Sequence, residues 1–328
     1  MSLTVSESAR PSLDFIPEWF QSAFTTICWS LLLGVWLAAA FGPIYALWCF
    51  HKRSLDSLLT FLCLWFLGGM IKVPYLPSLS ESFASGLESW FKSFTIKHEH
   101  AHSRAAEPDS PKKTIYCYHP HGLFSLGMAL LAADLVRRGE KIAIVASNHM
   151  RFFNPVAKII LDMAGIELVG ASPREVQAAM KRGDRSLILV PGGYEEAVMT
   201  QNGFERLYLD RRMGFVKYAM RYGYTLTPVY AYGENDFYVC VPIANSVRSF
   251  LAQYKLPLAI FYGDTRFPLL PRRTDHGLHI VVGEAVKVIP EANPSLSELH
   301  RAHNEYKERL IQLYYRYNKE NDRPLEVL

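Results

Sequence analysis

The sequence is poor in charged residues, and this scarcity excludes some classes of protein. Of its 328 residues, 20% are Asp, Glu, Lys or Arg, below the roughly 25% of ordinary soluble domains. The net charge is +4, but no dense stripe of Lys or Arg occurs, so we expect no nucleic-acid partner. A mild basic excess instead suits an anionic ligand or an anionic membrane surface.

Cysteine spacing and several nucleotide-binding or hydrolase motifs are also missing. The five cysteines include no CxxC pair, so neither a disulfide framework nor a zinc site is expected, and we predict no metal and no permanently bound cofactor. The sequence has no GxGxxG and no P-loop. Because no GxSxG surrounds Ser125, a serine hydrolase is disfavoured. The cysteines are Cys28, Cys49, Cys63, Cys117 and Cys240.

Apolar residues make up 50% of the chain, and they gather in two runs near its start. Residues 1–18 form a polar tail, and Trp19–Phe50 follows without a charged residue, long enough to span a bilayer. The run Ser57–Ile71 is shorter and fits either a tilted membrane helix or a buried core helix. We therefore predict that residues 19–76 form a membrane-embedded helical hairpin and residues 77–328 a catalytic domain. No basic region precedes the first run, so we expect no cleaved signal peptide.

Two segments connect the hairpin to the rest of the chain. Leu87–Ile96 has apolar and aromatic residues at helical spacing, which predicts a helix that either lies flat on the membrane or packs on the domain. His98–Lys113 is polar and contains two prolines, so it is predicted to be a loop.

From residue 113 onward, strand and helix patterns alternate. The β-branched and aromatic runs predict strands at 114–119, 141–147, 166–172, 186–193, 226–233 and 278–288. Helical patterns cover 126–139, 155–166, 173–183 and 214–224, and a final helix follows the capping box of Ser295 and Glu298. This alternation predicts an α/β fold with a largely parallel sheet flanked by helices, and a site beyond the carboxyl ends of its strands.

The sharpest chemical signal is the pair of histidines in Tyr118-His119-Pro120-His121-Gly122, between a predicted strand and a predicted helix. Histidine is the usual general base near neutral pH. Gly122 permits close approach of the backbone to a ligand, and the helix start beyond it offers N–H groups to an anion. The alternative is a packed turn with a hydrogen-bonded histidine. No third ligand at metal-site spacing accompanies the pair.

Three further clusters follow predicted secondary-structure elements. Pro191–Glu196 contains two glycines that expose backbone N–H groups, and Glu196 could orient a histidine or bind a substrate hydroxyl; an ordinary glycine-rich turn is the alternative. Arg211–Phe215, with Lys217 after it, places basic groups at a helix start, which suits a phosphorylated ligand, although a solvated face has the same pattern. Pro228–Asn235 ends a strand that faces the same site.

A fourth pattern resembles a catalytic motif but lacks one of its residues. Asn148-His149 with Asn154 imitates an Asn-His…Asp acyltransferase box, but the acidic residue is missing, so His149 is not predicted to be the base.

Taken in order, these motifs resemble the type-2 diacylglycerol acyltransferase family, which includes monoacylglycerol and wax-alcohol acyltransferases. The resemblance rests on YHPHG, PGGYEE, RRMGFVKYAMRYGYTLTPVYAYGEND and VVGEAVKVIP, and it runs from Tyr116 to Lys319. The closing HNEYKERLIQLYYRYNK resembles the last helix of the family, and FLCLWFL in the second apolar run looks like its neutral-lipid-binding segment. The chain departs from the common pattern at Met213, where a basic residue is frequent, and between Asn245 and Asp275.

The resemblance implies a glycerolipid-acyltransferase-like fold and a specific set of site residues. The catalytic residues would be His121, His119 and Glu196. The substrate-binding residues would be Gly122, Gly192, Gly193, Arg212, Gly214, Phe215, Lys217, Glu234 and Asn235. Phe61, Leu62 and Leu64 would bind lipid.

The resemblance also implies a reaction and a location. The enzyme would transfer an acyl group from acyl-CoA to diacylglycerol, forming triacylglycerol. Our hypothesis is direct transfer with His121 as general base, and the sequence leaves open whether His119 is the base instead. Monoacylglycerol, a long-chain alcohol or a sterol are alternative acceptors, and a non-catalytic lipid-droplet-binding protein is the alternative of another class. The implied location is the endoplasmic reticulum membrane or a lipid droplet, with the catalytic domain in the cytosol and a homo-oligomer left open.

Overall fold

The computed structural model describes residues 18–99, 113–148, 154–241, 261–318 and 323–328, except for the side chains of residues 18–20, 35–40 and 43. The predicted N-terminal tail up to residue 17, most of the predicted polar loop, and His149 lie outside the described residues, as do residues 242–260.

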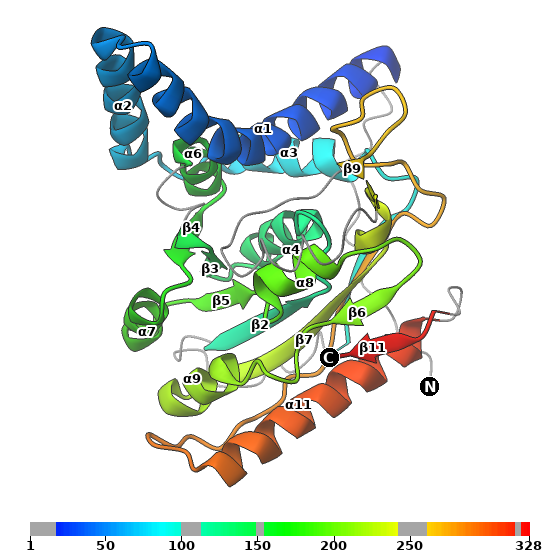
Figure 1. Ribbon diagram of the computed structural model, residues 1–328. Helices are drawn as coiled ribbons and strands as arrows, with labels where there is room; N and C mark the ends of the chain where they lie inside the picture. Colours follow the sequence, from blue (N-terminus) through cyan, green and yellow to red (C-terminus); the bar gives the residue numbers. More distant parts are fainter. Residues whose placement is uncertain (1–17, 100–112, 149–153, 242–260, 319–322) are drawn as a thin grey trace.

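A seven-stranded sheet forms the centre of the molecule, and helices cover both of its faces (Figure 1). Its strand order is β1-β10-β7-β2-β5-β3-β4. Neighbouring strands from β4 to β7 run parallel, whereas β10 is antiparallel to β7 and parallel to β1. The prediction of a largely parallel sheet is therefore confirmed. The strands are β1 Phe94–His98, β2 Thr114–His119, β3 Ile142–Ala146, β4 Ile166–Gly170, β5 Ser186–Leu189, β7 Thr225–Tyr232 and β10 Leu278–Val282.

The two faces of the sheet carry separate hydrophobic clusters. On one face, α1 (Glu18–His51), α3 (Pro77–Glu88) and α4 (Leu126–Arg137) contribute buried side chains such as Trp29, Leu87 and Leu131. On the other, α7 (Pro173–Arg182), α9 (Gly214–Tyr222) and α11 (Leu296–Tyr317) contribute Met180, Val216 and Leu310. The helices predicted at 126–139, 155–166, 173–183 and 214–224 are present, whereas the helix at Gly193–Met199 was not predicted. Ser295 and Glu298 form the expected capping box of α11.

Smaller elements complete the domain. α6 is Pro155–Met163, α8 is Gly193–Met199, and a 3₁₀ turn, η1, covers Glu234–Asp236. Short strands β6 (Glu205–Leu207) and β11 (Leu325–Val327) pair in parallel, which brings the chain end back to the domain. β8 (Val239–Cys240) pairs with β9 (Phe261–Tyr262).

Two predicted strands are shorter than expected. β5 ends at Leu189, because Gly193 already begins α8. β10 ends at Val282, and after it Val286 makes only an isolated bridge to Leu226.

The prediction of a helix over Leu87–Ile96 is wrong. Helix α3 ends at Glu88, and residues from Phe94 form edge strand β1, which pairs with β10. Alternating burial along β1 shows the period of two that a half-buried strand requires. Because Trp90 and Phe91 are buried in the core, this segment packs on the domain rather than lying flat on a membrane.

The two apolar runs form a helical hairpin. α1 (Glu18–His51) is bent in Figure 1, and Pro43 within it lacks the N–H that would bond one turn back. α2 (Leu55–Met70) follows after a short turn, and a Cβ on Gly42 would meet the Trp65 ring at 2.5 Å, so the helices lie in close contact. No residue of α2 is buried, which makes the alternative of a buried core helix wrong. In the described parts of the chain, no helix combines the length and apolar character that a bilayer-spanning segment needs.

Candidate active site

The ends of three adjacent strands bring the predicted motifs together. β7, β2 and β5 are neighbours and run parallel. The histidine turn follows β2, the glycine pair follows β5, and Glu234 follows β7. Because parallel strands end at one edge of a sheet, these three segments meet there, as the sequence predicts for an α/β fold.

His121 presents one nitrogen that is free to act as a base. Its side chain is partly exposed, and its Nδ1 lies 3.0 Å from the carbonyl oxygen of Gly122. A carbonyl only accepts hydrogen bonds, so Nδ1 carries the proton and Nε2 carries the lone pair. Loss of hydration lowers the pKa of His121 below its usual value, and the imidazole is therefore neutral at pH 7.

Glu196 holds the backbone of the histidine turn. It lies in α8 and is 2% exposed. Its Oε1 accepts a hydrogen bond from the N–H of His121 at 2.6 Å, and its Oε2 accepts one from the N–H of Tyr208 at 3.2 Å. Burial raises the pKa of Glu196 to about 8, against the lowering effect of these two bonds. A Cβ at Gly192 would lie 1.8 Å from Oε2, so only glycine fits beside this carboxyl.

Glu234 holds the first turn of α4. Its carboxyl accepts hydrogen bonds from the N–H groups of Leu126, at 2.8 Å, and Gly127, at 3.0 Å. Tyr118 donates its hydroxyl proton to the same carboxyl at 2.7 Å. Burial raises the pKa of Glu234 to about 7. The sequence singled out Glu234 as a substrate contact, whereas in the structure its bonds go to the protein itself.

Gly122 lies directly against this carboxyl. Its φ of +58° belongs to the left-handed region, and a Cβ there would come within 2.7 Å of Cγ of Glu234. Glycine is thus required both by the backbone conformation and by the neighbouring side chain.

His119 is placed differently from His121. It is fully buried on the α11 side of the sheet, and its Nε2 lies 3.0 Å from the hydroxyl of Tyr306. Its Nδ1 has no partner among the described residues. Burial lowers the pKa of His119 to about 3, so this imidazole is neutral and has no contact with solvent.

The basic element at the start of α9 lies at the same edge. Arg212 forms an ion pair with Glu195, and its guanidinium lies 5.1 Å from the centre of the Tyr208 ring. Gly214 and Lys217 are exposed, whereas Phe215 is buried against Tyr306 with ring centres 5.1 Å apart. Since the backbone of Tyr208 also bonds Glu196, the basic element is linked to the histidine turn. Gly193, the remaining glycine of the set, has a φ of +58° and donates its N–H to Val190.

Asn235 belongs to a buried polar network that the sequence did not reveal as a unit. Its side-chain amide donates to Glu205 at 2.8 Å, and Tyr230 donates to the same carboxylate at 2.8 Å. Arg323 contacts Glu205 at 3.5 Å and Asp236 at 2.9 Å. These residues are up to 118 positions apart, so no local sequence signal could have grouped them.

The predicted lipid-binding residues are not part of the histidine turn. Phe61 and Leu62 are half-buried on α2, and Leu64 is 68% exposed there. The ring of Phe61 lies 5.1 Å from that of Tyr45 and 5.0 Å from that of Trp65. They belong to the hairpin that projects from the domain in Figure 1.

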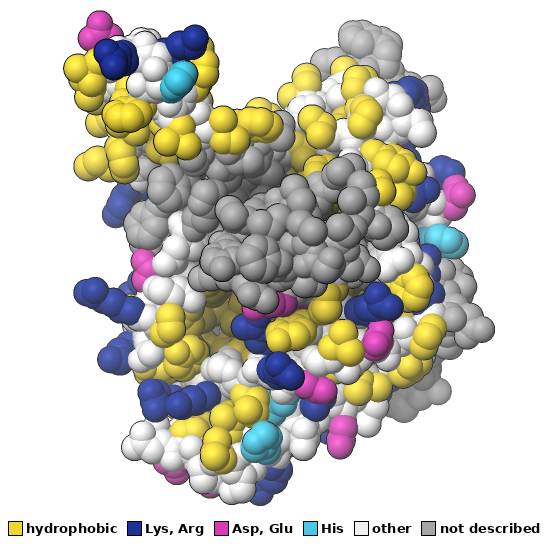
Figure 2. Space-filling view, in the orientation of Figure 1, with side chains coloured by type: hydrophobic (Ala, Val, Ile, Leu, Met, Phe, Trp, Pro, Cys, Tyr) yellow, Lys and Arg dark blue, Asp and Glu magenta, His cyan; other side chains and the backbone are white. Residues whose placement is uncertain are grey.

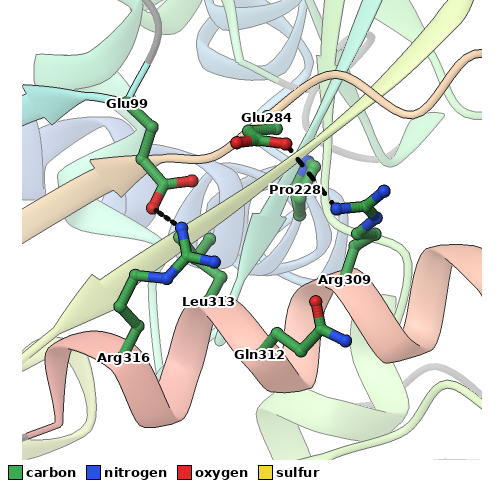
Figure 3. Close-up of a pocket in the computed structure, with 7 residues that line it drawn as sticks. All are labelled: Glu99, Pro228, Glu284, Arg309, Gln312, Leu313 and Arg316. Carbon is green, nitrogen blue, oxygen red and sulfur yellow. Dashed lines mark hydrogen bonds and ion pairs between the residues drawn. The ribbon is translucent and has the colours of Figure 1, made fainter.

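A small pocket lies elsewhere, between α11 and the far ends of β1 and β10 (Figure 3). Its walls include the ion pairs Arg316–Glu99 and Arg309–Glu284. Its volume of about 10 Å³ is room for roughly one water molecule. Apart from Pro228, the first residue of the predicted cluster 228–235, none of its lining residues is a predicted site residue. No cluster of three or more potential metal ligands occurs in the described ranges.

The fold and this edge define an α/β protein with a histidine-centred site on a mostly parallel sheet. Comparison with known sequences gives the particular family. Residues 70–327 match the diacylglycerol acyltransferase family, and the chain belongs to it.

Individual relatives agree with this assignment. The chain is 32% identical over 232 residues to diacylglycerol O-acyltransferase 1 of Schizosaccharomyces pombe, covering 65% of this chain and 66% of that protein. It is 30% identical to diacylglycerol O-acyltransferase 2 of Dictyostelium discoideum, covering 63% of this chain and 66% of the relative. Diacylglycerol O-acyltransferase 2 of Homo sapiens is 28% identical, over 61% of this chain and 55% of its own length. The chain thus spans between 55% and 66% of the length of these relatives.

Proposed function

We propose that this protein is an acyl-CoA-dependent O-acyltransferase that forms triacylglycerol from diacylglycerol. The observation that carries the proposal is the hydrogen bond from His121 Nδ1 to the carbonyl of Gly122, at 3.0 Å. It directs the basic Nε2 away from the turn, in a partly exposed side chain at the carboxyl edge of the sheet. Family membership supports the reaction class.

In the proposed mechanism, Nε2 of His121 accepts the proton of the acceptor hydroxyl while its oxygen attacks the thioester carbonyl carbon. The carbonyl electrons move to oxygen and form a tetrahedral oxyanion. The C–S bond then breaks, the ester forms, and the coenzyme A thiolate takes the proton from the imidazolium. Ser125 donates its hydroxyl proton to the carbonyl oxygen of His121 at 3.0 Å and not to the imidazole. We therefore assign Ser125 no nucleophilic role and propose no covalent enzyme intermediate.

The remaining residues of the turn have supporting roles in this proposal. Glu196 fixes the position of His121 through its backbone N–H, and Glu234 fixes the adjoining helix start. His119 supports the turn from the α11 side of the sheet, because its imidazole is buried against Tyr306. Since the N–H of Gly193 is directed to Val190, we assign stabilisation of the oxyanion to the backbone at Gly122.

The phosphates of acyl-CoA are assigned to Arg212 and Lys217 at the start of α9. Lys217 is exposed, and the ion pair of Arg212 with Glu195 is one-third exposed, so both cations can meet a dissolved ligand. Exchange of a carboxylate for a phosphate is favourable for a guanidinium, which binds either group through two parallel hydrogen bonds. Gly214 lets the ligand approach the first N–H groups of the helix.

The hairpin is assigned to lipid. Exposed apolar side chains cover α2 and the second half of α1, including Leu47, Phe50, Leu64 and Phe66, each at least 60% exposed. Figure 2 shows them as the hydrophobic surface of the upper left projection. Such a surface is unfavourable in water and suits a bilayer or a lipid droplet. We therefore propose that residues 19–76 form the lipid-associated part, residues 77–328 the catalytic domain, and the endoplasmic reticulum membrane the location.

The test is acyl transfer by full-length protein in vesicles, with labelled acyl-CoA and competing acceptors. A general base contributes about 10²–10⁴-fold, so His121→Ala should lose activity by that factor and keep its melting temperature. His300→Ala, which removes an exposed histidine of α11, is the matched control.

Near-normal transfer by folded His121→Ala would refute the mechanism. Preference for a monoacylglycerol, an alcohol or a sterol would correct the acceptor, and absence of transfer to all of them would refute the enzyme assignment.

A further inference from the structure

The segment after β9 presents apolar side chains to solvent on a tightly bonded loop. Tyr262, Phe267 and Leu269 are 47%, 53% and 50% exposed. The next residue, Leu270, is 4% exposed and belongs to the core. Leu270 therefore anchors the loop in the core, and the exposed side chains belong to a packed segment.

Backbone hydrogen bonds close this loop. Gly263 donates to the carbonyl of Pro268 at 2.7 Å, and Asp264 donates to that of Leu270 at 2.8 Å. A Cβ at Gly263 would lie 1.8 Å from the Leu270 oxygen, so glycine is required for this closure. The hydroxyl of Tyr238 donates to the carbonyl of Leu269 at 3.1 Å. Phe267 and Leu269 are thus held outward by a fixed backbone.

The base of the loop is joined to the helix that begins the hairpin. The indole N–H of Trp90 donates to the carbonyl of Pro271 at 3.0 Å, and the guanidinium of Arg273 lies 4.1 Å from the centre of the Trp90 ring. Trp90 in turn contacts Trp29 of α1, with ring centres 6.2 Å apart. Near Trp29, α1 exposes Ile27 and Leu31, at 57% and 50%. In Figure 1 the loop, in orange, lies at the same end of the molecule as α1.

The charge of the loop identifies the kind of surface that it would meet. Residues 261–274 contain three arginines and one aspartate, an excess of two positive charges. Arg266 and Arg273 are exposed beside the apolar side chains. Aromatic and aliphatic side chains next to arginines suit the boundary between acyl chains and anionic headgroups.

We infer that residues 262–273 are a second membrane contact, in which Phe267 and Leu269 enter an anionic lipid surface while the arginines bind its headgroups. The inference rests on the proposed association of this protein with membranes and adds a contact that lies far beyond the hairpin in the chain. With two contacts, the domain has a fixed orientation on the membrane instead of swinging on the hairpin.

The experiment uses full-length protein carrying one environment-sensitive fluorophore. Cys63 is the exposed cysteine of the five, so Cys63→Ser removes the native labelling site. Leu269→Cys places the label on the loop. Ile289→Cys, at a residue 64% exposed outside the loop, is the matched control. The protein is incorporated into phosphatidylcholine vesicles with and without phosphatidylserine, and doxyl-labelled lipids serve as quenchers.

We expect the label at residue 269 to shift to the blue, to gain about twofold in emission and to be quenched by the doxyl lipids, more strongly with phosphatidylserine. The label at residue 289 should do none of these. If the protein floats with the vesicles but both labels are equally exposed to water, the second contact is refuted and the proposed function is not affected. A blue shift without quenching by the doxyl lipids would point to protein association and also overturns it.

Two further outcomes separate the inference from the proposed function. A chain that fails to float with vesicles overturns both the second contact and the membrane assignment. Insertion of the label in a chain that transfers no acyl group leaves the contact supported and refutes the enzyme assignment.

Discussion

At the scale of single residues, the two histidines of the turn differ in exposure and in hydrogen-bond partner. His121 is partly exposed and has a defined tautomer, because its Nδ1 faces a carbonyl oxygen. His119 is sealed against Tyr306. The sequence predicted the turn but could not distinguish the two imidazoles, because alternation along β2 and the direction of the following turn decide which of them faces the solvent.

The first prediction concerns pH. Only neutral His121 accepts a proton, and burial lowers its pKa below the ordinary value of 6.5. The neutral form of His121 predominates above that pKa, and it is lost as the pH falls through the pKa. We therefore expect kcat/KM to fall on the acidic side with a midpoint below pH 6.5. Thermal stability measured at each pH is the control, and a midpoint above 6.5 would contradict this role of His121.

The second prediction concerns Gly122. Gly122→Ala introduces both an unfavourable positive φ and a contact with Glu234. Gly223→Ala is the matched control, because Gly223 has a φ of +69° but no atom within 4 Å of the added Cβ. Both variants should lose about 1 kcal/mol of stability to backbone strain. Only Gly122→Ala should also lose most acyl transfer, and equal activity of the two variants would show that the contact is unimportant.

At the scale of secondary-structure elements, α4 begins without a cap of its own. Ser125 precedes it at a φ of +50° and makes no side-chain capping bond. The carboxyl of Glu234 bonds the first N–H groups instead. The sequence predicted α4 from its periodicity, but not this cap, because Glu234 becomes a neighbour only after β7 has paired with β2. By contrast, the cap of α11 is local and was predicted.

The third prediction follows from this cap. Glu234→Ala leaves two buried N–H groups and the hydroxyl of Tyr118 without an acceptor. Each such group costs about 1–3 kcal/mol, so we expect a marked fall in the free energy of unfolding together with loss of activity. Glu298→Ala is the comparison, because Glu298 caps α11 at the surface, where water can replace the carboxyl. Denaturant titration in detergent measures both, and a smaller loss for Glu234→Ala than for Glu298→Ala would contradict the argument.

At the scale of the whole molecule, the chain end closes the domain. β11 pairs with β6, and the carbonyl of Leu328 accepts hydrogen bonds from Leu209 and Asp210, each at 2.8 Å. Arg323 supplies the cation for Asp236 and Glu205. The sequence predicted the five parallel strands, whose residues are continuous apolar runs. It missed β6 and β11, because three-residue strands have no periodicity, and it missed β1, because its pairing with β10 spans the length of the domain.

The fourth prediction is that the chain end is necessary for stability. Deleting residues 323–328 removes a strand and leaves two largely buried carboxylates without their cation. We expect a loss of about 2 kcal/mol or more, which corresponds to a fall in Tm of roughly 5 °C. Glu326→Ala is the control, because it breaks only the exposed ion pair with Arg206. An unchanged Tm after the deletion would show that the network is self-sufficient.

The borrowed cap of α4 also has a consequence for synthesis of the protein. Leu126 and the carboxyl that holds it are 108 positions apart. A ribosome therefore releases the histidine turn long before it releases the group that secures the next helix. In every nascent chain that stops short of Glu234, the helix that follows His121 lacks the group that caps it. The proposed site is therefore complete only after β7 and Glu234 have left the ribosome and packed beside β2.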